Sequence, residues 1–461
     1  MFRQTKSSTY QAMLIAQQST RQTGKALLQI EVNKRYFLNL QEEVEKLYYL
    51  RDHYYDSSQS ESSQDQKWNV VKKEMLAIVG KIKSLYFIDD TPSSIHPSIF
   101  QYLLGRAHNV MPDYDLEAQN YLSSAVKLNP SYVEAWNELG ECFWKGGDTL
   151  SAKNCFSCAL EKFRNKVSLR NLSIVLRQLR VTDTEERKKL LFEGLSLAKE
   201  AVQLDPTDGK SWLILGNAYF SVAFYSTHSD GYIHKALAAY GQSEKYEVNQ
   251  RNFNTADLCF NKAMALFHDE KYQEALENLE RSQKFEPDWE LCKSKYEFTL
   301  QFLLNVKEMV TFKGKLKPRK LISMLKSINS KDLGLYRTNS IYKRAFLQDL
   351  AVGTNKGKYI LAKVIASVSY DGGSPLACCI SDKQDFAAVA TIYRLSQDYG
   401  LTIGDSLLIP EPNMHTIHFS FKGEVINFLC VRVDSPQNIL VNGHNLQPTQ
   451  MATMFIKFSS I

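Results

Sequence analysis

The residues best placed for chemistry are charged and aromatic side chains that recur at regular intervals between positions 137 and 267. Arg170 and Arg177 supply guanidinium groups, and Asp257 supplies a carboxylate. A guanidinium group can hold a carboxylate through two parallel hydrogen bonds. Such a set of residues suits the recognition of a charged peptide. The side chains between these charges, mostly aromatic or amide, would then contact the rest of that peptide.

Patterns typical of catalysis or metal binding are not found in this sequence. The nine histidines are scattered, and neither a G-x-S-x-G motif nor a phosphate-binding loop occurs. Cys155 and Cys158 form a C-x-x-C pair, but no second Cys/His pair follows at the spacing of a zinc ribbon. We read this pair as packing residues and the eight cysteines as reduced thiols. The sequence therefore predicts a protein that is not an enzyme and needs no cofactor and no metal.

The positions of the charged residues depend on a repeated helical unit. Trp136, Leu139, Gly140 and Phe143 are followed by Ala152, Phe156 and Ala159. The spacing W-x2-L-G-x2-Y, followed by A-x3-F on a unit of about 34 residues, is typical of a tetratricopeptide (TPR) repeat. Each such unit is a pair of antiparallel helices that cannot bury its apolar face alone. Several units must stack, and the stack presents a concave binding groove.

Four further units follow the same spacing, and two of them carry insertions. Their first helices are marked by Leu104, Leu169, Trp212 and Cys259. The inserts, Thr182 to Lys189 and Tyr225 to Tyr232, are expected to lengthen turns. Before these units, residues 34–90 predict two helices joined by a mobile linker from Asp56 to Gln66. This hairpin lacks the repeat signature, as a capping unit often does.

One stripe on the first helix of each unit is expected to line the groove. Residues that directly follow the W, G and Y positions recur at helical spacing and share one face. The candidates for peptide contact on this stripe are Trp144, Arg170, Arg177, Asn217, Phe220 and Met264, and Asp257 lies at its rim. The alternative is that the charged members are ordinary solvated surface residues. Glu141 and Ile174 occupy positions where a carboxylate-clamp repeat needs Lys and Asn, which disfavours a chaperone tail as the partner.

The C-terminal part of the chain has the pattern of a small β domain. Short β-branched runs alternate with Gly, Pro and Asp turns, and one short helix is expected over Ile392 to Tyr399. The predicted strands are Tyr359 to Val368, Leu376 to Ile380, Ala387 to Ile392, Ser406 to Ile409 and Phe428 to Val433. This order favours a barrel of the OB-fold type, with a β-sandwich as the alternative. The second and third strands carry no aromatic residues, which argues against nucleic-acid binding on that face.

A basic run precedes the β domain. Its five members are Lys313, Lys315, Lys317, Arg319 and Lys320. Pro318 argues against a regular helix here, so we expect an extended basic strand. One interpretation is contact with a polyphosphate, most plausibly RNA; the other is a solvated linker. The net charge of +6 over 461 residues is modest, so any basic surface has to be local.

These observations predict a mainly α protein: a right-handed α-solenoid of TPR hairpins followed by a C-terminal β-barrel of the OB-fold type. The predicted parts are an extension (1–33), a capping hairpin (34–92), the repeat array (93–304), a basic connector (305–345) and the OB domain (346–461). The extension has the composition of either a transit peptide or a disordered tail. No apolar run is long enough to span a bilayer, and no membrane partner is expected.

The order of these parts and four strings of residues are similar to the tetratricopeptide repeat protein 5 family, also called Strap. The strings are VEAWNELGECFWKGGD, RNKVSLRNLSIVLRQLR, DGKSWLILGNAYFS and LTIGDSLLIPEPN. The similarity extends from about Leu40 to the end of the predicted barrel. It implies a helical repeat array followed by an OB fold, in agreement with the patterns above.

Two activities follow from the resemblance. One is recognition of the first residues of nascent tubulin (Met-Arg-Glu and then Cys or Ile) at the ribosome, followed by tubulin mRNA decay through an adaptor. The other is that of a nuclear, stress-responsive transcription cofactor of an acetyltransferase coactivator. Cytoplasmic and nuclear localisation are both implied. The family's groove residues correspond to Arg177, Asp257 and, with a shift of one residue in the W-P-E motif, Glu290; the basic run matches its ribosome-facing segment.

Overall fold

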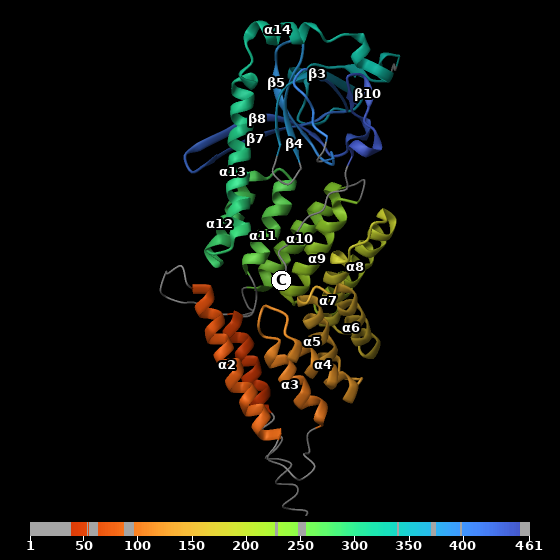
Figure 1. Cartoon of the computed structure of the whole chain (residues 1–461). Coiled ribbons are helices and arrows are strands. Elements are labelled where there is room, and N and C mark those ends of the chain that lie inside the picture. The colour runs from red at the N-terminus through yellow and green to blue at the C-terminus, as the bar shows by residue number, and fades with distance from the viewer. Residues whose placement is uncertain are drawn as a thin grey trace, which may run out of the picture. The chain divides into compact units, whose positions relative to one another are not determined.

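The computed structural model describes residues 38–52, 54, 63–86, 96–225, 229–247, 255–338, 341–369, 375–396 and 399–451 (Figure 1). The chain forms two compact units, with the main division between Ile214 and Leu215. The N-terminal extension lies outside the described residues, so both interpretations of it stay predictions.

Unit 1 consists of helical hairpins in chain order. After a helix over residues 38–52, its elements are α2 (Ser63–Tyr86), α3 (Pro97–His108), α4 (Leu116–Leu128), α5 (Val133–Lys145), α6 (Thr149–Lys162), α7 (Lys166–Gln178) and α8 (Thr184–Leu204). α9 (Gly209–Ala223) crosses the division between the units. The predicted capping hairpin and the first three repeats are therefore confirmed as helical pairs.

The signature glycine explains how the two helices of a repeat approach each other. A Cβ atom on Gly140 would lie 2.6 Å from Cε1 of Phe156, so only glycine leaves room for that ring. Phe156 is buried with Ala152 from the same helix and Leu172 from the next hairpin. The W-L-G-Y and A-F positions thus form the core between helices, as the repeat pattern requires.

Three predicted loops are partly helical. Asp183 caps α8 by accepting a hydrogen bond from the Glu186 backbone N–H at 3.0 Å, so most of the insert from Thr182 to Lys189 extends a helix instead of a turn. Similarly, residues 63–66 of the predicted linker belong to α2, while residues 55–62 lie outside the described residues. The insert in the fourth repeat is also shorter than predicted, because α10 begins at Ser229.

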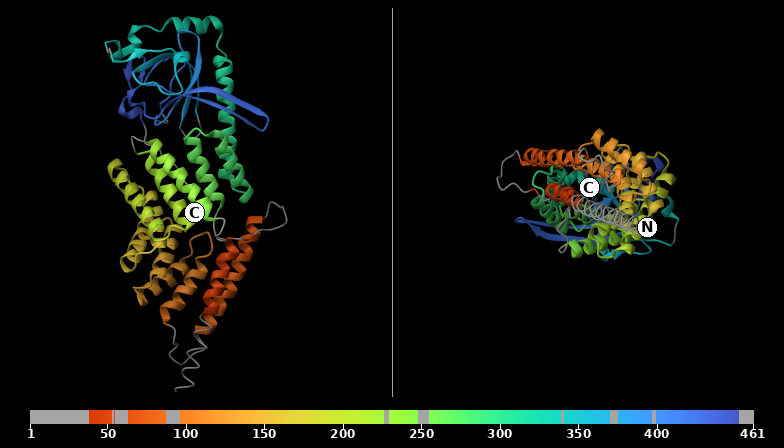
Figure 2. Two further views of the ribbon diagram at one scale, coloured as in Figure 1. Left: turned by 180° about the vertical axis from the view of Figure 1, so that it is seen from behind. Right: turned by 90° about the horizontal axis from the view of Figure 1, so that it is seen from below.

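Unit 2 contains the last repeats, a long helix and the β domain. Its helical elements are α10 (Ser229–Glu247), α11 (Thr255–His268), α12 (Tyr272–Phe285), α13 (Glu290–Thr311), η1 (Lys313–Lys315), α14 (Pro318–Lys326) and η2 (Ser330–Arg337), with short η3 (Leu347–Asp349), η4 (Pro436–Asn438) and η5 (Pro448–Gln450) in the β domain. α13 runs alongside the barrel, which Figure 2 shows from behind. Among the described residues, no helix is long and apolar enough to cross a bilayer.

The β domain closes into a barrel through one bent segment. Its main strands are β3 (Lys358–Ser369), β4 (Leu376–Ser381), β5 (Ala387–Ile392), β6 (Ser406–Pro410), β7 (Asn413–Phe421) and β8 (Glu424–Val433), with short β1 (Lys343–Arg344), β2 (Gly353–Thr354), β9 (Leu440–Val441) and β10 (His444–Asn445). Hydrogen bonding joins β6-β3-β4-β5-β8-β7 in this order. Because β6 and β7 are separated only by residues 411–412, the two ends of this path are one continuous segment, and the sheet closes.

All five predicted strands are confirmed, but the helix predicted over Ile392 to Tyr399 is wrong for the residues described there. Arg394 has a φ of 61°, and Leu395 forms a β-bridge with Met451, so this segment cannot be a regular helix. The sequence prediction also missed β7. Its polar residues alternate with apolar ones because one face is buried and the other is exposed.

The repeats and the barrel of unit 2 share one hydrophobic core. Phe302 on α13 and Leu321 on α14 belong to the same buried cluster as Ile365 and Phe419 of the barrel. α13 also continues without a break past the predicted boundary at residue 304. The last repeat, the connector and the barrel therefore fold together, although the sequence suggested three separate parts.

Candidate functional site

A polar pocket in unit 1 brings the helix over residues 38–52 together with the first helices of the first and fourth repeats. It has a volume of about 470 Å³ and lies between the helix over 38–52, α3 and the start of α9. Its lining residues are Glu42, Glu45, Lys46, Tyr48, Tyr49, Arg51, Asp52, Arg106 and Lys210. Arg106 directly follows the signature position Gly105, so it stands on the stripe that the repeat pattern assigns to the concave face. We call this cavity the unit 1 pocket.

Arg106 is the centre of the hydrogen-bond network in this pocket. Its guanidinium group donates to both carboxylate oxygens of Glu45, at 2.5 and 3.1 Å, and its Nε lies 3.2 Å from a carboxylate oxygen of Glu138. The Tyr48 hydroxyl donates to the Arg106 carbonyl at 3.0 Å and lies 3.3 Å from Glu138. The N-terminal helix is thus tied to the first two repeats by charged groups rather than by apolar packing alone.

Burial shifts the pKa values of three ionisable groups in or near the pocket. Burial, followed by the charge of Glu141, raises the pKa of Glu138. Burial lowers the pKa of Lys145, and burial together with the nearby charge of Arg170 lowers that of Lys210. Acids with raised and bases with lowered pKa values are groups whose charge is incompletely compensated. Of the three, only Lys210 lines the unit 1 pocket itself; groups with shifted pKa values in a cavity are typical of binding sites.

Three sequence candidates for peptide contact lie in unit 1. Arg170 pairs with the largely buried Asp208, and the Trp144 indole N–H donates to the Gln178 side chain. Arg177 is only 8 % exposed in the last turn of α7, and its Nε donates to the Ser173 carbonyl at 3.3 Å. Its side-chain stem passes close to Gly194 of α8. The structure thus holds all three side chains in fixed surroundings.

The candidates of the fourth and fifth repeats lie in unit 2, and two of them have structural roles. Phe220 is completely buried and packs edge-on against Phe224 and His268, so it belongs to the core, and its assignment as a peptide contact stays a prediction. Asn217 is also buried, and its side-chain oxygen accepts a hydrogen bond from the Tyr240 hydroxyl at 2.8 Å. The aromatic ring that packs over the signature glycine needs this partner, which explains why an amide occupies the position. Met264 is half-buried against Phe260 and its neighbours.

The two acidic candidates differ in how firmly the structure holds them. Asp257 is 4 % exposed and lies in the first turn of α11, where the helix dipole favours a negative charge. The Glu290 side chain is 81 % exposed at the start of α13 and pairs with Lys293 at 2.8 Å. Asp257 is therefore a buried carboxylate, whereas Glu290 lies on the open surface.

The basic run is folded, which overturns the expected extended strand. Lys313, Gly314 and Lys315 form a left-handed turn, and a Cβ on Gly314 would lie 2.7 Å from the Ile365 carbonyl oxygen. Pro318 is the first residue of α14, a position where its fixed φ favours a helix. The sequence reasoning treated Pro318 as a helix breaker, which holds only for the interior of a helix.

The five cations of the run fall into two groups. Lys313 bonds to the Asp385 side chain at 2.7 Å, and Lys315 pairs with Glu308 at 2.6 Å. Lys317, Arg319 and Lys320 are exposed at the N-terminus of α14, and the structure shows no ion pair for them within its described part. The first two therefore help to hold the fold, and the other three remain accessible to a partner.

Known proteins resemble this chain along most of its length. Residues 341–455 match the family described as tetratricopeptide repeat protein 5 OB fold domain. Tetratricopeptide repeat protein 5 from Homo sapiens is 38 % identical over 88 % of this chain and 92 % of its own length, and the Mus musculus protein is 37 % identical over 90 % and 94 %. The chain belongs to the tetratricopeptide repeat protein 5 family. A thermophilic TPR protein of Thermus thermophilus is a weaker match, with 22 % identity, a TM-score of 0.37, and coverage of 44 % of this chain and 99 % of that one.

Family membership and the observed fold support a role in protein binding, of the non-enzymatic kind that repeat scaffolds commonly have. The sequence analysis missed most of the unit 1 pocket. Arg106 could have been found, because it follows Gly105 as Glu141 follows Gly140. Glu138 and Lys210 lie off that stripe, and their approach depends on how successive repeats stack.

Proposed function

We propose that this protein is a ribosome-associated, non-enzymatic receptor that binds the N-terminus of nascent tubulin and triggers decay of the tubulin mRNA. Two buried side chains of opposite charge, each in its own unit, support this proposal. Arg177 lies on the first helix of the third repeat and Asp257 on the first helix of the fifth. A peptide that begins Met-Arg-Glu carries one base and one acid, which match these two groups.

Burial makes the two charges selective. A charged side chain in a desolvated site binds its matching partner strongly, because the wrong partner leaves a buried charge unpaired. In this proposal Arg177 receives the peptide glutamate and Asp257 receives the peptide arginine. Glu290, on the open surface, contributes less than either because solvent screens its charge.

The exposed cations of α14 support a second, separate contact with the ribosome. The first turn of α14 contains Arg319 and Lys320 but no acidic residue. Positive charge at a helix N-terminus opposes the helix dipole, at a cost of about 0.3–1 kcal/mol per group. Because this arrangement does not favour the helix, a role outside the fold explains it better. Phosphates of ribosomal RNA are the partner that fits clustered cations.

Selective ribosome profiling of a tagged copy tests the proposal directly. Wild-type protein should be enriched on ribosomes that translate tubulin once the N-terminus has left the exit tunnel. Arg177→Ala should remain on ribosomes without this enrichment, because only peptide reading is lost. Serine at positions 317, 319 and 320 should remove the protein from all ribosomes. A wild-type profile without enrichment on tubulin would overturn the assignment of the peptide.

A further inference from the structure

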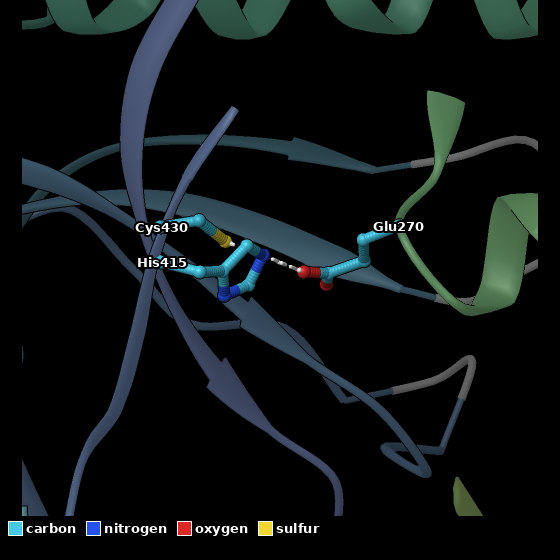
Figure 3. Close-up of side chains that lie close together, drawn as sticks. All are labelled: Glu270, His415 and Cys430. Carbon is cyan, nitrogen blue, oxygen red and sulfur yellow. Dashed lines mark hydrogen bonds and ion pairs between the residues drawn. The ribbon is translucent and has the colours of Figure 1, made fainter. Parts of the chain in front are cut away.

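Three residues from distant parts of the sequence meet where the last repeat contacts the barrel in unit 2. Glu270 lies in the turn between α11 and α12, and its side chain is directed towards His415 and Cys430 (Figure 3). His415 on β7 and Cys430 on β8 are directly opposed cross-strand partners. Opposed residues in antiparallel strands have Cβ atoms about 4.5–5.5 Å apart, so both side chains can reach one point.

The backbone at Glu270 is held in an uncommon conformation. Its φ is 58°, in the left-handed region that non-glycine residues rarely adopt, and the residue is almost fully buried. Residues kept in such conformations cluster at functional sites, where the surrounding structure offsets their strain. Here the strained turn brings a carboxylate into the barrel.

The two carboxylate oxygens of Glu270 face different groups. Oε1 accepts hydrogen bonds from the Thr391 hydroxyl at 2.7 Å and the Tyr393 hydroxyl at 2.9 Å. Oε2 lies 2.5 Å from His415 Nε2 and 3.8 Å from Cys430 Sγ. Oε1 is therefore fixed by two hydroxyl groups, while Oε2 faces one nitrogen and one sulfur.

We propose that Glu270 Oε2, His415 Nε2 and Cys430 Sγ bind a divalent transition metal, with zinc as the natural occupant. The three atoms lie within 4.8 Å of one another. Carboxylate, imidazole and thiolate are the ligands that Zn²⁺ prefers, at about 2.0–2.3 Å, which places tetrahedral ligands about 3.3–3.7 Å apart. The oxygen–sulfur separation nearly meets this spacing already. The oxygen–nitrogen pair has to open by somewhat less than 1 Å as the metal replaces the proton between them.

The surroundings supply the remaining requirements of a metal site. The Thr391 and Tyr393 hydroxyls orient the carboxylate, as hydrogen-bonding partners of metal ligands usually do. The Arg432 guanidinium lies 3.7 Å from Oε1, on the side away from the ligand atom, and pairs with Asp434 at 2.7 Å, which reduces its repulsion of a cation. The His415 side chain is 28 % exposed, so a metal can enter there and keep one water as its fourth ligand. Binding releases the Cys430 thiol proton to solvent, and the proton between His415 and Glu270 moves to Nδ1 of a neutral imidazole or leaves a charged one for solvent.

Metal analysis of the untagged full-length protein tests this proposal. After purification with zinc and removal of free metal, elemental analysis should give about one zinc per chain. In the chelator-treated protein, added Co²⁺ should produce the thiolate-to-cobalt charge-transfer band and the intense d–d bands of a tetrahedral site. Cys430→Ser should abolish the charge-transfer band, and both this variant and His415→Gln should lower bound zinc at least tenfold.

Matched variants separate this site from other thiols. Cys379→Ser removes a buried thiol from β4, and Cys158→Ser breaks the C-x-x-C pair of α6; both should retain the zinc and the cobalt spectrum. Circular dichroism and thermal unfolding should show that each variant is folded. If the folded wild type binds no zinc and gives no cobalt–thiolate band, the three residues form only a hydrogen-bonded ion pair, and the proposal fails. Retention of zinc by folded Cys430→Ser would also overturn it.

Discussion

Two buried carboxylates, Glu138 in unit 1 and Glu270 in unit 2, have pKa values that are shifted in opposite directions. Burial raises the pKa of Glu138, and the neighbouring Glu141 raises it further; Arg106 only partly offsets this. Burial also tends to raise the pKa of Glu270, but the hydrogen bond from His415 and the charge of Arg432 lower it to about 2.

The difference lies in how many donors face each group. Glu270 is surrounded by two hydroxyls, an imidazole and a guanidinium from three strands of the barrel. Glu138 shares Arg106 with Glu45, and its neighbour Glu141 is also an acid. A buried charge that is surrounded by matching donors contributes to stability, whereas burial of an incompletely matched charge costs free energy. The following experiments test that distinction, from the largest expected effect to the smallest.

Removal of the Glu270 carboxylate should cause the largest loss of stability. Glu270→Ala leaves the Arg432 and His415 groups buried without their partner, and breaking a buried pair typically costs about 3–5 kcal/mol. Denaturant unfolding of metal-free protein, followed by the fluorescence of unit 2, measures this effect. Glu274→Ala, four residues away and exposed, should change stability by less than about 0.5 kcal/mol. Equal stability of the two variants would show that the contact between the last repeat and the barrel does not depend on the Glu270 charge.

Loss of the Arg177 guanidinium should weaken peptide binding without unfolding the repeats. Truncation of one partner of a desolvated charge pair costs about 2–5 kcal/mol, so Arg177→Ala should bind a Met-Arg-Glu peptide at least tenfold more weakly. Titration calorimetry gives the affinity. Arg180→Ala, at an exposed position three residues later, is the control and should bind as wild type does. Unchanged affinity of Arg177→Ala would place the peptide elsewhere.

The exposed cations (Lys317, Arg319 and Lys320) and the ion-paired Lys313 should differ in how much they contribute to the salt dependence of ribosome binding. Each phosphate contact contributes about 0.9 to the log–log salt slope, so serine at positions 317, 319 and 320 should reduce the slope of ribosome binding by up to about 3. Lys313→Ser should leave the slope nearly unchanged, because that lysine already bonds to Asp385. Co-sedimentation at several salt concentrations measures both. A loss of slope with Lys313→Ser alone would contradict the division into two groups.

The smallest effect is expected at Glu138. Since its pKa is raised on folding, the folded state binds the proton more tightly, and stability is lost as pH rises from about 4.5 through the folded pKa. Glu138→Gln carries no charge at any pH and should lack this loss, with a change at pH 7 within about 1 kcal/mol. Thermal unfolding between pH 4 and pH 8 compares the two proteins. A strongly destabilised glutamine variant would mean that Glu138 is a structural charge like Glu270.

Several elements were predictable because their signals are local. The repeat helices follow from Trp136, Gly140 and their equivalents, since each pattern depends only on which side chains fill one hairpin core. The strands from Tyr359 onward follow from short β-branched runs. The two wrong predictions also have local causes. Pro318 was expected to prevent a helix, but it stands at the start of α14, where its fixed φ is favourable. A helix was expected after Ile392, but Arg394 has a left-handed backbone conformation.

The sequence by itself determined the class of repeat, the positions of its core residues and the family, because side-chain size and period alone specify a helical hairpin. Only the tertiary structure decided which buried charges have an opposite charge or a hydrogen-bond donor beside them. Glu270 meets residues more than 120 positions away, and Arg106 meets Glu45 across two repeats. Compensation of a buried charge depends on every donor around it, and these donors come together only when repeats stack and strands pair.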